Sequence, residues 1–492
     1  MARVMLITPD YHCGVVESAG RWPHLGFVYI AGELRKAGHQ VRIYDAMSKN
    51  HRLEEMIRNI SGYRPEVVGT TAFTASMPAA ADLLKAVKQS DGNVMTVVGG
   101  IHPTFCYREV LEEHPHIDYV ISGEGEYTFP ALLAALDQKG AIDEVAGIAY
   151  RAGDKIIATA ERPFLTDLDA LTPAWDLLDW EDYTFYVYPG TRLAIISTSR
   201  GCRHTCKFCS QQKFWRQTWR ARAPEKVLME VQHLVRAHGV DIFFISDEYP
   251  TLDRRRWEEI LDGLIRMDLG ARFLIETRVD DIIRDADIMH KYRRAGIIHI
   301  YVGIEATSQG TLDYFKKEIV TNDSKRALDL IHSAGIVSET SFVLGTPDET
   351  AESICQTLAL AKAYNPDFAH FLLLAPWPYA DLYEELKDFI VTRDYSKYNL
   401  VEPVIKPRAM TTGQLFQQVL RCYREFYFAK MAEWASLEDG FKRRYAIQSM
   451  RAIMDNSFLK EHLLGLGTLP AVVKRLMKSL GEETDGGISG LK

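Results

Sequence analysis

The chain has 492 residues, which is long enough for two or three domains with complete hydrophobic cores. Hydrophobic residues make up 47% of it and charged residues 25%, an ordinary globular composition. The formal net charge of −8 argues against an extended nucleic-acid surface. No apolar run reaches the length of a membrane span and the first residues lack a signal-peptide pattern, so we expect a cytoplasmic protein.

The first 140 residues alternate short apolar runs with amphipathic stretches of helical length. Five runs read as strands, at residues 4–9, 40–45, 66–73, 93–100 and 117–123. This alternation predicts an α/β domain over residues 1–140 with a doubly wound parallel sheet, which binds ligands beyond the carboxyl ends of its strands. The loops TPDYHCG, TTAFTAS, GGIHPT and SGEGE follow four of these strands. Glycine-rich turns without a ligand are the alternative, but four loops on one edge favour a binding site.

The rest of the chain divides into three parts. Residues 141–185 mix acidic, proline and tryptophan residues without a sustained period, and we interpret them as a linker. Alternation returns over residues 186–400, with candidate strands at 193–199, 241–247, 272–277, 298–305, 339–345 and 369–375. They predict a closed or partly closed β/α barrel, with its active site at the carboxyl ends of the strands. Residues 401–492 are expected to be helical.

Three of the seven cysteines lie in the stretch GCRHTCKFCS, directly after the first predicted barrel strand. Seven cysteines in so long a chain do not form a disulfide scaffold, and a tight cluster indicates metal binding or catalysis. A zinc site needs four ligands, usually as two cysteine pairs, and no second C-x2-C pair occurs. Iron–sulfur clusters normally take four thiolates, so Cys202, Cys206 and Cys209 would leave one iron open to a ligand. Buried thiols or a zinc site are the alternatives here, and ordinary thiols are expected at Cys13, Cys106, Cys355 and Cys422.

The spacing C-x3-C-x2-C after a first barrel strand, with Phe208 before the last cysteine, resembles the radical S-adenosylmethionine (SAM) superfamily. The resemblance implies a [4Fe-4S] cluster on the three cysteines, whose open iron binds SAM and whose electron cleaves it to a 5′-deoxyadenosyl radical. The second barrel strand ends in Ser246-Asp247-Glu248, where the family often has G-G-E, so this position departs from the pattern. Surface salt bridges are the alternative for each charged residue. The resemblance nominates as SAM-binding residues Phe208, Glu248, Glu276, Arg278, Glu305 of GIEATS, and Val343 and Gly345 of FVLGTPDET.

The sheet and barrel together resemble the cobalamin-binding branch of that superfamily over roughly residues 1–400. Asp10, His12 and Gly14 fall near the D-x-H-x-x-G position that supplies a cobalt ligand in some corrinoid proteins. The glycine comes one residue early and the branch typically lacks this ligand, so we do not assign His12 to cobalt. The cobalamin-binding residues that the resemblance nominates are Thr71, Thr74, Gly99, Gly100, His102, Gly123, Glu124 and Gly125.

Stretches such as FCSQQKFWRQTWRAR and LLLAPWPYADLYEEL are similar to the anaerobic magnesium-protoporphyrin monomethyl ester cyclase group and its relatives. These relatives act on large flat or polycyclic substrates. The resemblance favours a methyltransferase that acts on an unactivated carbon of a hydrophobic polycyclic substrate, with a hopanoid lipid preferred. The alternatives are the oxidative cyclase, a bacteriochlorophyll methyltransferase and, more remotely, a tRNA-modifying radical SAM enzyme. The resemblance also implies an electron donor such as ferredoxin or flavodoxin, and no nucleic-acid partner.

The end of the chain is basic and partly apolar. Residues 441–480 contain eight Lys or Arg and two acidic residues, with apolar residues between them. A basic amphipathic helix can lie on anionic lipid, which would place the enzyme at the inner face of the membrane and suit a substrate that lives in lipid. A solvated helical face packed on the barrel is the alternative.

Overall fold

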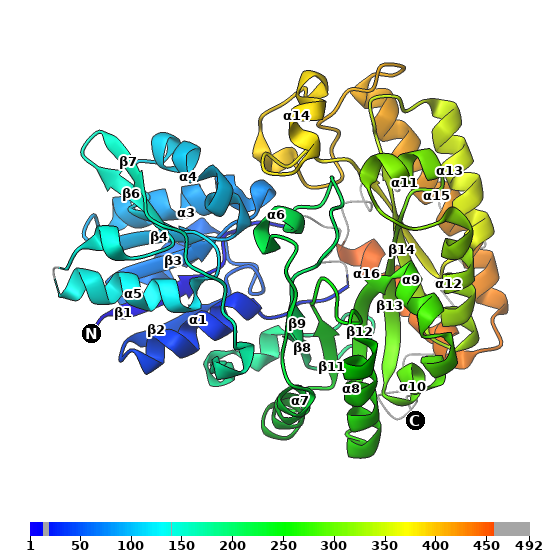
Figure 1. Ribbon diagram of the computed structural model, residues 1–492, viewed down its shortest axis with the longest axis horizontal. Helices are drawn as coiled ribbons and strands as arrows, with labels where there is room; N and C mark the ends of the chain where they lie inside the picture. Colours follow the sequence, from blue (N-terminus) through cyan, green and yellow to red (C-terminus); the bar gives the residue numbers. More distant parts are fainter. Residues whose placement is uncertain (13–18, 139, 457–492) are drawn as a thin grey trace.

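The computed structural model describes residues 1–12, 19–138 and 140–456. Two α/β units lie side by side, the first on the left of Figure 1 and the second on the right. The segment that contains α14 (Leu382–Leu386) lies above the junction between them in this view. The two-unit organisation agrees with the architecture predicted from the alternating pattern.

The first unit is a doubly wound parallel sheet, as predicted. Its strands run in the order β2-β1-β3-β4-β5, so the strand order reverses between β1 and β3. A crevice for a ligand forms at such a switch point, beyond the carboxyl ends of the strands. The strands are β1 (Arg3–Ile7), β2 (Gln40–Tyr44), β3 (Val67–Thr71), β4 (Met95–Gly99) and β5 (Tyr119–Ile121). The helices are α1 (Leu25–Lys36), α2 (Leu53–Tyr63), α3 (Met77–Ser90), α4 (Ile101–Glu113) and α5 (Gly125–Asp137).

The first sheet continues into the segment that was predicted to be a linker. Here β6 (Ile148–Ala152) and β7 (Lys155–Ala158) form a hairpin that adds antiparallel strands to β5. The sequence carries the signal, because Gly153 and Asp154 form a two-residue turn between runs of β-forming residues. The structure therefore differs from the predicted linker over its first part. The remainder, up to residue 191, consists of turns and short 3-10 helices.

The second unit is a partial barrel of six parallel strands in the order β15-β14-β13-β12-β11-β8. No pairing between β8 and β15 occurs in the described chain, so the barrel is open at that edge. The strands are β8 (Leu193–Ile196), β11 (Ile242–Ile245), β12 (Arg272–Arg278), β13 (Ile297–Glu305), β14 (Val337–Leu344) and β15 (Phe368–Leu373). The helices around them include α7 (Pro224–His238), α8 (Arg254–Met267), α9 (Val279–Arg284), α10 (Met289–Arg294), α11 (Gln309–Phe315), α12 (Thr321–Ser333) and α13 (Ala351–Tyr364).

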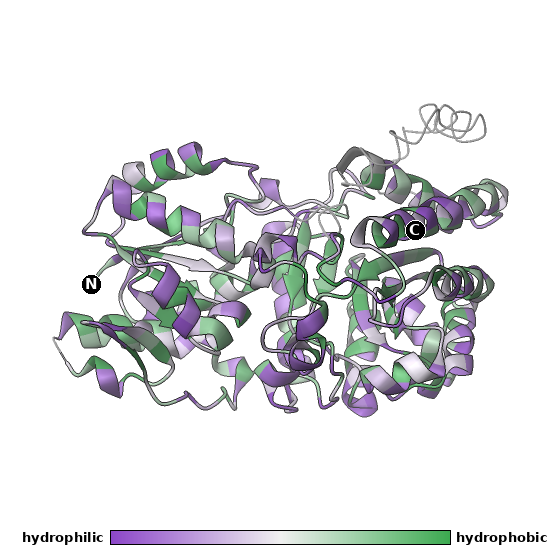
Figure 2. Ribbon diagram, turned by 90° about the horizontal axis from the view of Figure 1, so that it is seen from above, coloured by the Kyte–Doolittle hydropathy of each residue, from purple (hydrophilic) through white to green (hydrophobic). Residues whose placement is uncertain are grey.

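Hydrophobic residues concentrate on the strands and on the inner faces of the helices (Figure 2). The helices begin where the sequence supplies caps. The Asp253 carboxylate accepts a hydrogen bond from the Arg256 amide at the start of α8, and the Thr350 hydroxyl accepts one from the Ser353 amide at the start of α13. These caps fix the loops that precede the helices, and the active face of a barrel is built from such loops.

The predicted C-terminal helical region contains α15 (Thr412–Ser436) and α16 (Gly440–Asn456). Helix α16 packs on the barrel, because Lys442 is buried and its ammonium lies 2.9 Å from the Asp367 carboxylate. For this part of the basic stretch the structure favours a packed helix over a lipid-facing one. Residues 457–492, with the remaining basic residues, lie outside the described residues. No helix in the described ranges is long and apolar enough to cross a membrane.

Candidate active site

The loop with the three cysteines leaves the barrel at the carboxyl end of β8. It is tied to the sheet through a short antiparallel ribbon of β9 (Ser199–Arg200) and β10 (Arg220–Ala221). Gly201 starts the loop at φ +96°, and a Cβ there would lie 2.2 Å from the Thr218 carbonyl oxygen. Only glycine allows this approach, which turns the chain out of the ribbon and into the loop.

The three cysteines all lie on this loop, before α6 (Gln211–Trp215), and their role as cluster ligands stays a prediction. Cys206 is buried, whereas Cys202 and Cys209 are half-buried. Burial raises the pKa of all three thiols, that of Cys209 to about 12, so their thiolate forms need a positive partner. No three His, Cys, Asp or Glu side chains in the described part of the chain are placed to hold a single metal ion. In the predicted cubane each of the three thiolates would bind its own iron.

Two carboxylates after β11 anchor the loop. One oxygen of Glu248 lies 2.6 Å from the Trp215 indole nitrogen, and the other accepts a hydrogen bond of 3.1 Å from the Gly201 amide. Asp247 is buried and accepts hydrogen bonds from Thr198 and Ser199. The sequence analysis missed the anchoring role of Asp247, and a contact between Glu248 and SAM stays a prediction.

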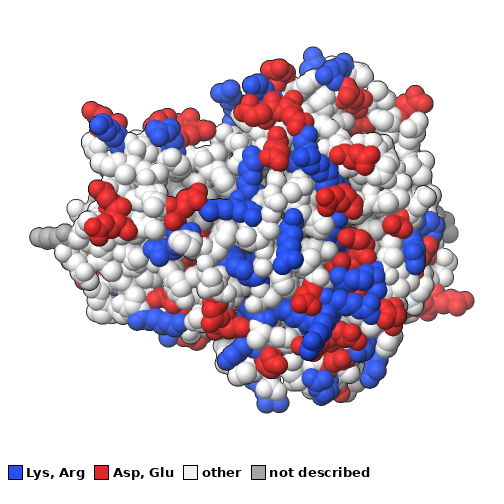
Figure 3. All heavy atoms as spheres, in the orientation of Figure 1, with Lys and Arg blue, Asp and Glu red and all other residues white. Residues whose placement is uncertain are grey.

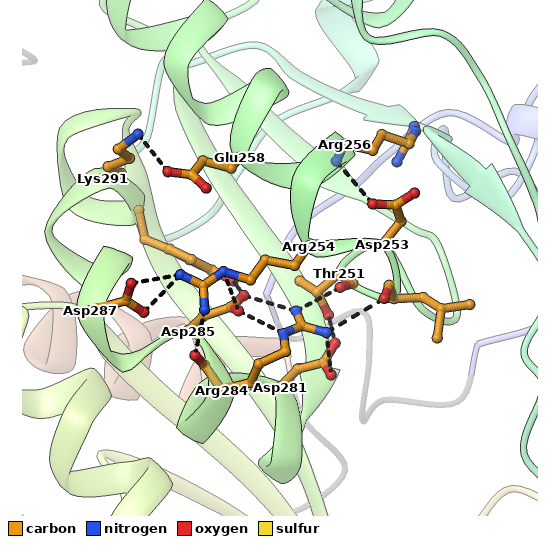
Figure 4. Close-up of polar contacts among 12 residues, drawn as sticks. Thr251, Asp253, Arg254, Arg256, Glu258, Asp281, Arg284, Asp285, Asp287 and Lys291 are labelled. Atoms are coloured by element: carbon orange, nitrogen blue, oxygen red, sulfur yellow. Dashed lines mark hydrogen bonds and ion pairs between the residues drawn. The ribbon is translucent and has the colours of Figure 1, made fainter.

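A buried ionic network supports the loop from the side of α8 and α9 (Figure 4). The Asp281 carboxylate accepts hydrogen bonds from Thr251 and, at 2.9 Å, from the Tyr249 hydroxyl, and it also pairs with Arg284. The Tyr249 ring lies 5.5 Å from the ring of His204, which belongs to the cysteine loop. The network therefore fixes a side chain that packs against the loop.

The other nominated SAM residues lie around the same end of the barrel. The Arg278 guanidinium donates to Asp280 and to the Lys317 carbonyl. The Glu305 carboxylate contacts the Lys317 ammonium at 2.9 Å and accepts from Ser341 at 3.0 Å, and its backbone is strained at φ +66°. Arg278, Glu305 and Lys317 form one buried group, and the contact of Arg278 and Glu305 with SAM stays a prediction.

Phe208 and the end of β14 complete this set. The Phe208 ring packs against Phe315 of α11 at 5.1 Å between ring centroids. Val343 lies in β14, and Gly345 follows it with φ +91°. The Gly345 amide donates to Glu349, which fixes the turn after the strand. A role for these positions beside adenine likewise stays a prediction.

A pocket of about 270 Å³ opens between the two units at the carboxyl edge of the first sheet. It joins the strand ends of the first unit to the cysteine-loop anchors Trp215 and Glu248. Glycines make room for it, because a Cβ on Gly69 would lie 2.9 Å from the Phe129 ring. Six nominated cobalamin residues line this pocket, namely Thr71, Gly99, Gly100, Gly123, Glu124 and Gly125. A ligand in this pocket would therefore contact both units, and the contact of these six residues with cobalamin stays a prediction.

Two nominated cobalamin residues lie elsewhere. Thr74 and His102 are buried, and the Thr74 hydroxyl shares hydrogen bonds with His102 and, at 3.0 Å, with the Tyr379 hydroxyl. Burial lowers the pKa of His102 to about 4, so the ring is neutral. Both residues contribute to the contact with the segment after β15. The His12 ring lies 3.6 Å from Asp10, while Cys13 and Gly14 lie outside the described residues.

The Glu124 carboxylate also has a structural partner that the sequence did not predict. It pairs with Arg200 at 2.8 Å and with Arg220 at 2.9 Å, both from the ribbon beside the cysteine loop. Burial acts to raise the pKa of Glu124, but the two guanidinium groups outweigh it and lower that pKa. Glu124 thus joins the two units, and its contact with cobalamin stays a prediction.

A second cavity, of about 330 Å³, lies inside the barrel. Its walls are mostly apolar and aromatic, but polar side chains of four strands enter it. Glu339 lies between two imidazoles, 2.8 Å from His299 and 2.5 Å from His370. Of the polar side chains that enter this cavity, only Glu276 was among the site residues nominated from the sequence, where it was assigned to SAM. The signal for the others was the presence of His and Glu inside otherwise apolar strands.

Known proteins match this arrangement. Residues 11–133 match the B12 binding domain family, and residues 196–361 match the radical SAM superfamily. The anaerobic magnesium-protoporphyrin IX monomethyl ester cyclase of Rubrivivax gelatinosus is 40% identical over 93% of this chain and 83% of its own length. The chain belongs to the family of cobalamin-binding radical SAM enzymes that includes this cyclase.

Other members of this family show the same organisation. The hopanoid C-3 methylase of Methylococcus capsulatus is 27% identical over 85% of this chain and 79% of its own length. The structure of the cobalamin-dependent radical enzyme OxsB, with aqua-cobalamin and SAM bound, superposes with a TM-score of 0.73. That match has 17% identity and covers 100% of this chain and 78% of the other, so it supports the fold. As a radical SAM enzyme of this family, the chain uses a [4Fe-4S] cluster, SAM and cobalamin.

Proposed function

We propose that this enzyme transfers a methyl group to an unactivated carbon of a large hydrophobic polycyclic molecule that carries polar groups, namely a tetrapyrrole. The barrel cavity is the main support for this proposal. Its aromatic and aliphatic walls suit a flat apolar ring system, while Glu276 requires a polar partner. An unactivated carbon has no acidic proton, so radical chemistry by the bound cofactors supplies the reactivity that side chains lack.

The residues of the chain position the reaction. Cys202, Cys206 and Cys209 would hold the cluster, and Glu248 and Asp247 keep their loop in place. The pocket between the units would hold cobalamin next to that loop. The cavity walls exclude water from the substrate, which protects a carbon radical from side reactions.

The hopanoid that the sequence analysis favoured has less support. A hopanoid ring skeleton is hydrocarbon and offers no hydrogen-bond donor or cation to the Glu276 carboxylate in the cavity. The methylase that carries that name is 27% identical to this chain, compared with 40% for the cyclase.

A second candidate function is oxidative ring closure on a magnesium porphyrin ester. The observation that favours it is the 40% identity to the Rubrivivax gelatinosus cyclase over 93% of this chain. Both reactions would begin with hydrogen abstraction by the deoxyadenosyl radical. They differ in whether the methyl group of SAM or an oxygen of water enters the product.

One experiment tests both. The anaerobically reconstituted enzyme is given SAM with a deuterated methyl group, labelled water, and either magnesium-protoporphyrin IX monomethyl ester or a hopanoid. We expect a deuterated methyl group on the tetrapyrrole, with S-adenosylhomocysteine and deoxyadenosine in similar amounts. Oxygen label in the tetrapyrrole without S-adenosylhomocysteine would establish ring closure instead, and methylation of the hopanoid alone would refute the proposed substrate.

The reaction needs an electron donor, for which we propose a ferredoxin or flavodoxin. Lys and Arg side chains gather along the middle of the face shown in Figure 3, with acidic side chains among them. Arg203, inside the cysteine loop, is exposed. An acidic carrier would meet positive charge there, close to the cluster that it must reduce.

Peripheral membrane contact through the last residues also stays a proposal.

A further inference from the structure

The barrel cavity contains one carboxylate that the described chain leaves without a partner. Glu276, on β12, has no hydrogen bond or ion pair with any of the described residues, and it lines the cavity. Glu339, on β14 and two strands away in the same sheet, does have partners. Its two oxygens face the Nε2 atoms of His299 and His370, and the Tyr445 hydroxyl shares a hydrogen bond of 2.6 Å with His299.

The electrostatic surroundings of these two glutamates differ accordingly. Burial acts to raise the pKa of Glu339, but the two imidazoles outweigh it and hold that pKa far below its ordinary value. Burial raises the pKa of Glu276 to about 7, and the charges of Glu248, Glu339 and Glu305 add to this. The negative charge of Glu276 is therefore costly until a ligand brings a positive centre to it.

The walls of the cavity define the rest of that ligand. Phe244, Leu274, Phe368 and Leu372 project from three strands, and Tyr427 of α15 closes the space. Aromatic and aliphatic side chains of this kind stack on flat, apolar surfaces. The ligand that fits the whole cavity is thus a flat, largely apolar molecule with a positive or hydrogen-donating centre.

We propose that Glu276 binds the magnesium ion at the centre of a metallotetrapyrrole as its axial ligand, an inference that rests on the proposed function. Mg²⁺ prefers oxygen ligands, and a carboxylate supplies one. The macrocycle occupies the equatorial positions, so a single protein ligand suffices. The assignment places Glu276 on the substrate, whereas the family resemblance nominated it for SAM.

His299 and His370 serve a different purpose in this arrangement. Their Nε2 atoms face Glu339, so they pair with that carboxylate and are not directed at the substrate. A second uncompensated charge beside Glu276 would repel it and would compete for the metal. Among the described residues that line the cavity, Glu276 is therefore the carboxylate left to meet a cationic centre.

The test measures binding of magnesium-protoporphyrin IX monomethyl ester and of its metal-free counterpart to the reconstituted holoenzyme. Fluorescence titration gives the two affinities, and the Soret absorption band reports axial ligation. We expect the wild type to bind the magnesium form at least about tenfold more tightly, and Glu276→Gln to lose this preference together with the Soret shift. Glu276→Asp, which keeps the carboxylate, should retain part of it.

Matched controls make the result specific. Glu352→Gln changes an exposed glutamate on α13 and should leave both affinities unchanged. Iron content and the corrinoid spectrum of each variant show that the protein is intact. If Glu276→Gln keeps the preference for the metal, or if the wild type has none, the axial-ligand assignment is refuted. If the wild type binds neither tetrapyrrole, the proposed substrate class is refuted with it.

Discussion

Glu248 and Glu276 lie near the ends of neighbouring barrel strands, yet their carboxylates have different tasks. Burial raises the pKa of both. Glu248 receives hydrogen bonds from Gly201 and Trp215, which hold the cysteine loop, whereas Glu276 faces an open cavity without a partner. A residue type at a strand end therefore does not fix its role, because the role depends on which donors the fold brings to it.

The pKa of Glu276 gives a pH dependence for substrate binding. The carboxylate must lose its proton to face a metal cation, so affinity for the magnesium tetrapyrrole should rise with pH up to about 7 and level off above it. Below pH 7 a proton competes with the metal for the Glu276 carboxylate, so the affinity for the magnesium tetrapyrrole should fall by up to about tenfold per pH unit. Of the groups around it, Glu248, Glu305 and Glu339 are acidic, and Tyr301 stays protonated because burial raises its pKa.

Titrations from pH 5.5 to 8.5 measure this dependence. Glu276→Gln should give a flat profile over the same range. A wild-type profile without a rise near pH 7 would contradict the role of Glu276 as a ligand to the metal.

Replacement of Cys202, Cys206 or Cys209 by Ala should remove most of the bound iron and abolish deoxyadenosine formation. Three thiolates leave no spare ligand for a [4Fe-4S] cluster. Iron analysis and chromatography of the products measure both effects. Cys355→Ala, at a half-buried cysteine far along the chain, is the control and should keep its full iron content. Normal turnover in any one of the three loop variants would refute the radical mechanism.

At the scale of elements, glycine positions set the shape of the cofactor pocket. Gly100 precedes α4 with φ +103°, and a Cβ there would lie 2.4 Å from the Ala72 carbonyl oxygen. This close approach holds the loop after β4 against the loop after β3, and both loops form the edge of the pocket. Glycine is needed because an L side chain has neither the space nor the favoured backbone region.

Gly100→Ala should therefore destabilise the protein by about 1–3 kcal/mol and weaken cobalamin retention. Urea unfolding and the corrinoid absorption that remains after gel filtration measure the two effects. The matched control is Gly62→Ala in α2, where a Cβ would meet nothing within 4 Å. That change should stabilise by about 0.5–1 kcal/mol and leave cobalamin binding intact. Equal cobalamin retention in both variants would contradict the assigned pocket.

At the scale of the whole molecule, the cofactor pocket exists only where the two units meet. Arg200, on the ribbon beside the cysteine loop, pairs with Glu124 at 2.8 Å and with Glu126 at 2.7 Å from the first unit. The segment after β15 adds a second junction, because the Tyr379 hydroxyl reaches Thr74. These contacts hold the pocket proposed for cobalamin in place beside the cysteine loop.

Arg200→Ala should cost about 3–5 kcal/mol of stability, because it leaves carboxylates that are nearly buried without one of their partners. Urea unfolding measures the loss, and limited proteolysis reports whether the two units separate. Arg255→Ala is the control. Arg255 is 91% exposed and pairs with Glu259 within α8, so its loss should cost no more than about 0.5 kcal/mol. Similar losses in the two variants would show that the junction does not depend on Arg200.

Strand–helix alternation in both units and the clustering of three cysteines could be predicted from the sequence, because these signals are local. Strand periodicity arises within a few residues, and three thiolates within eight residues hold a cluster on one loop wherever that loop lies. The hairpin of β6 and β7 also had a local signal, in the turn at Gly153 and Asp154. The glycine-rich loops indicated the cofactor edge for the same reason, since their positions follow from the strands before them.

Only the tertiary structure decided which charges meet. Glu339 is separated from His299 by 40 residues and from His370 by 31, and strand pairing brings them together. The Glu124–Arg200 pair likewise depends on how the two units dock. Such partners are set by register and docking, which have no counterpart in local spacing. The sequence could name Glu124, Glu248 and Glu276 as functional candidates, but only the fold shows that the first two have structural partners and that Glu276 has none among the described residues.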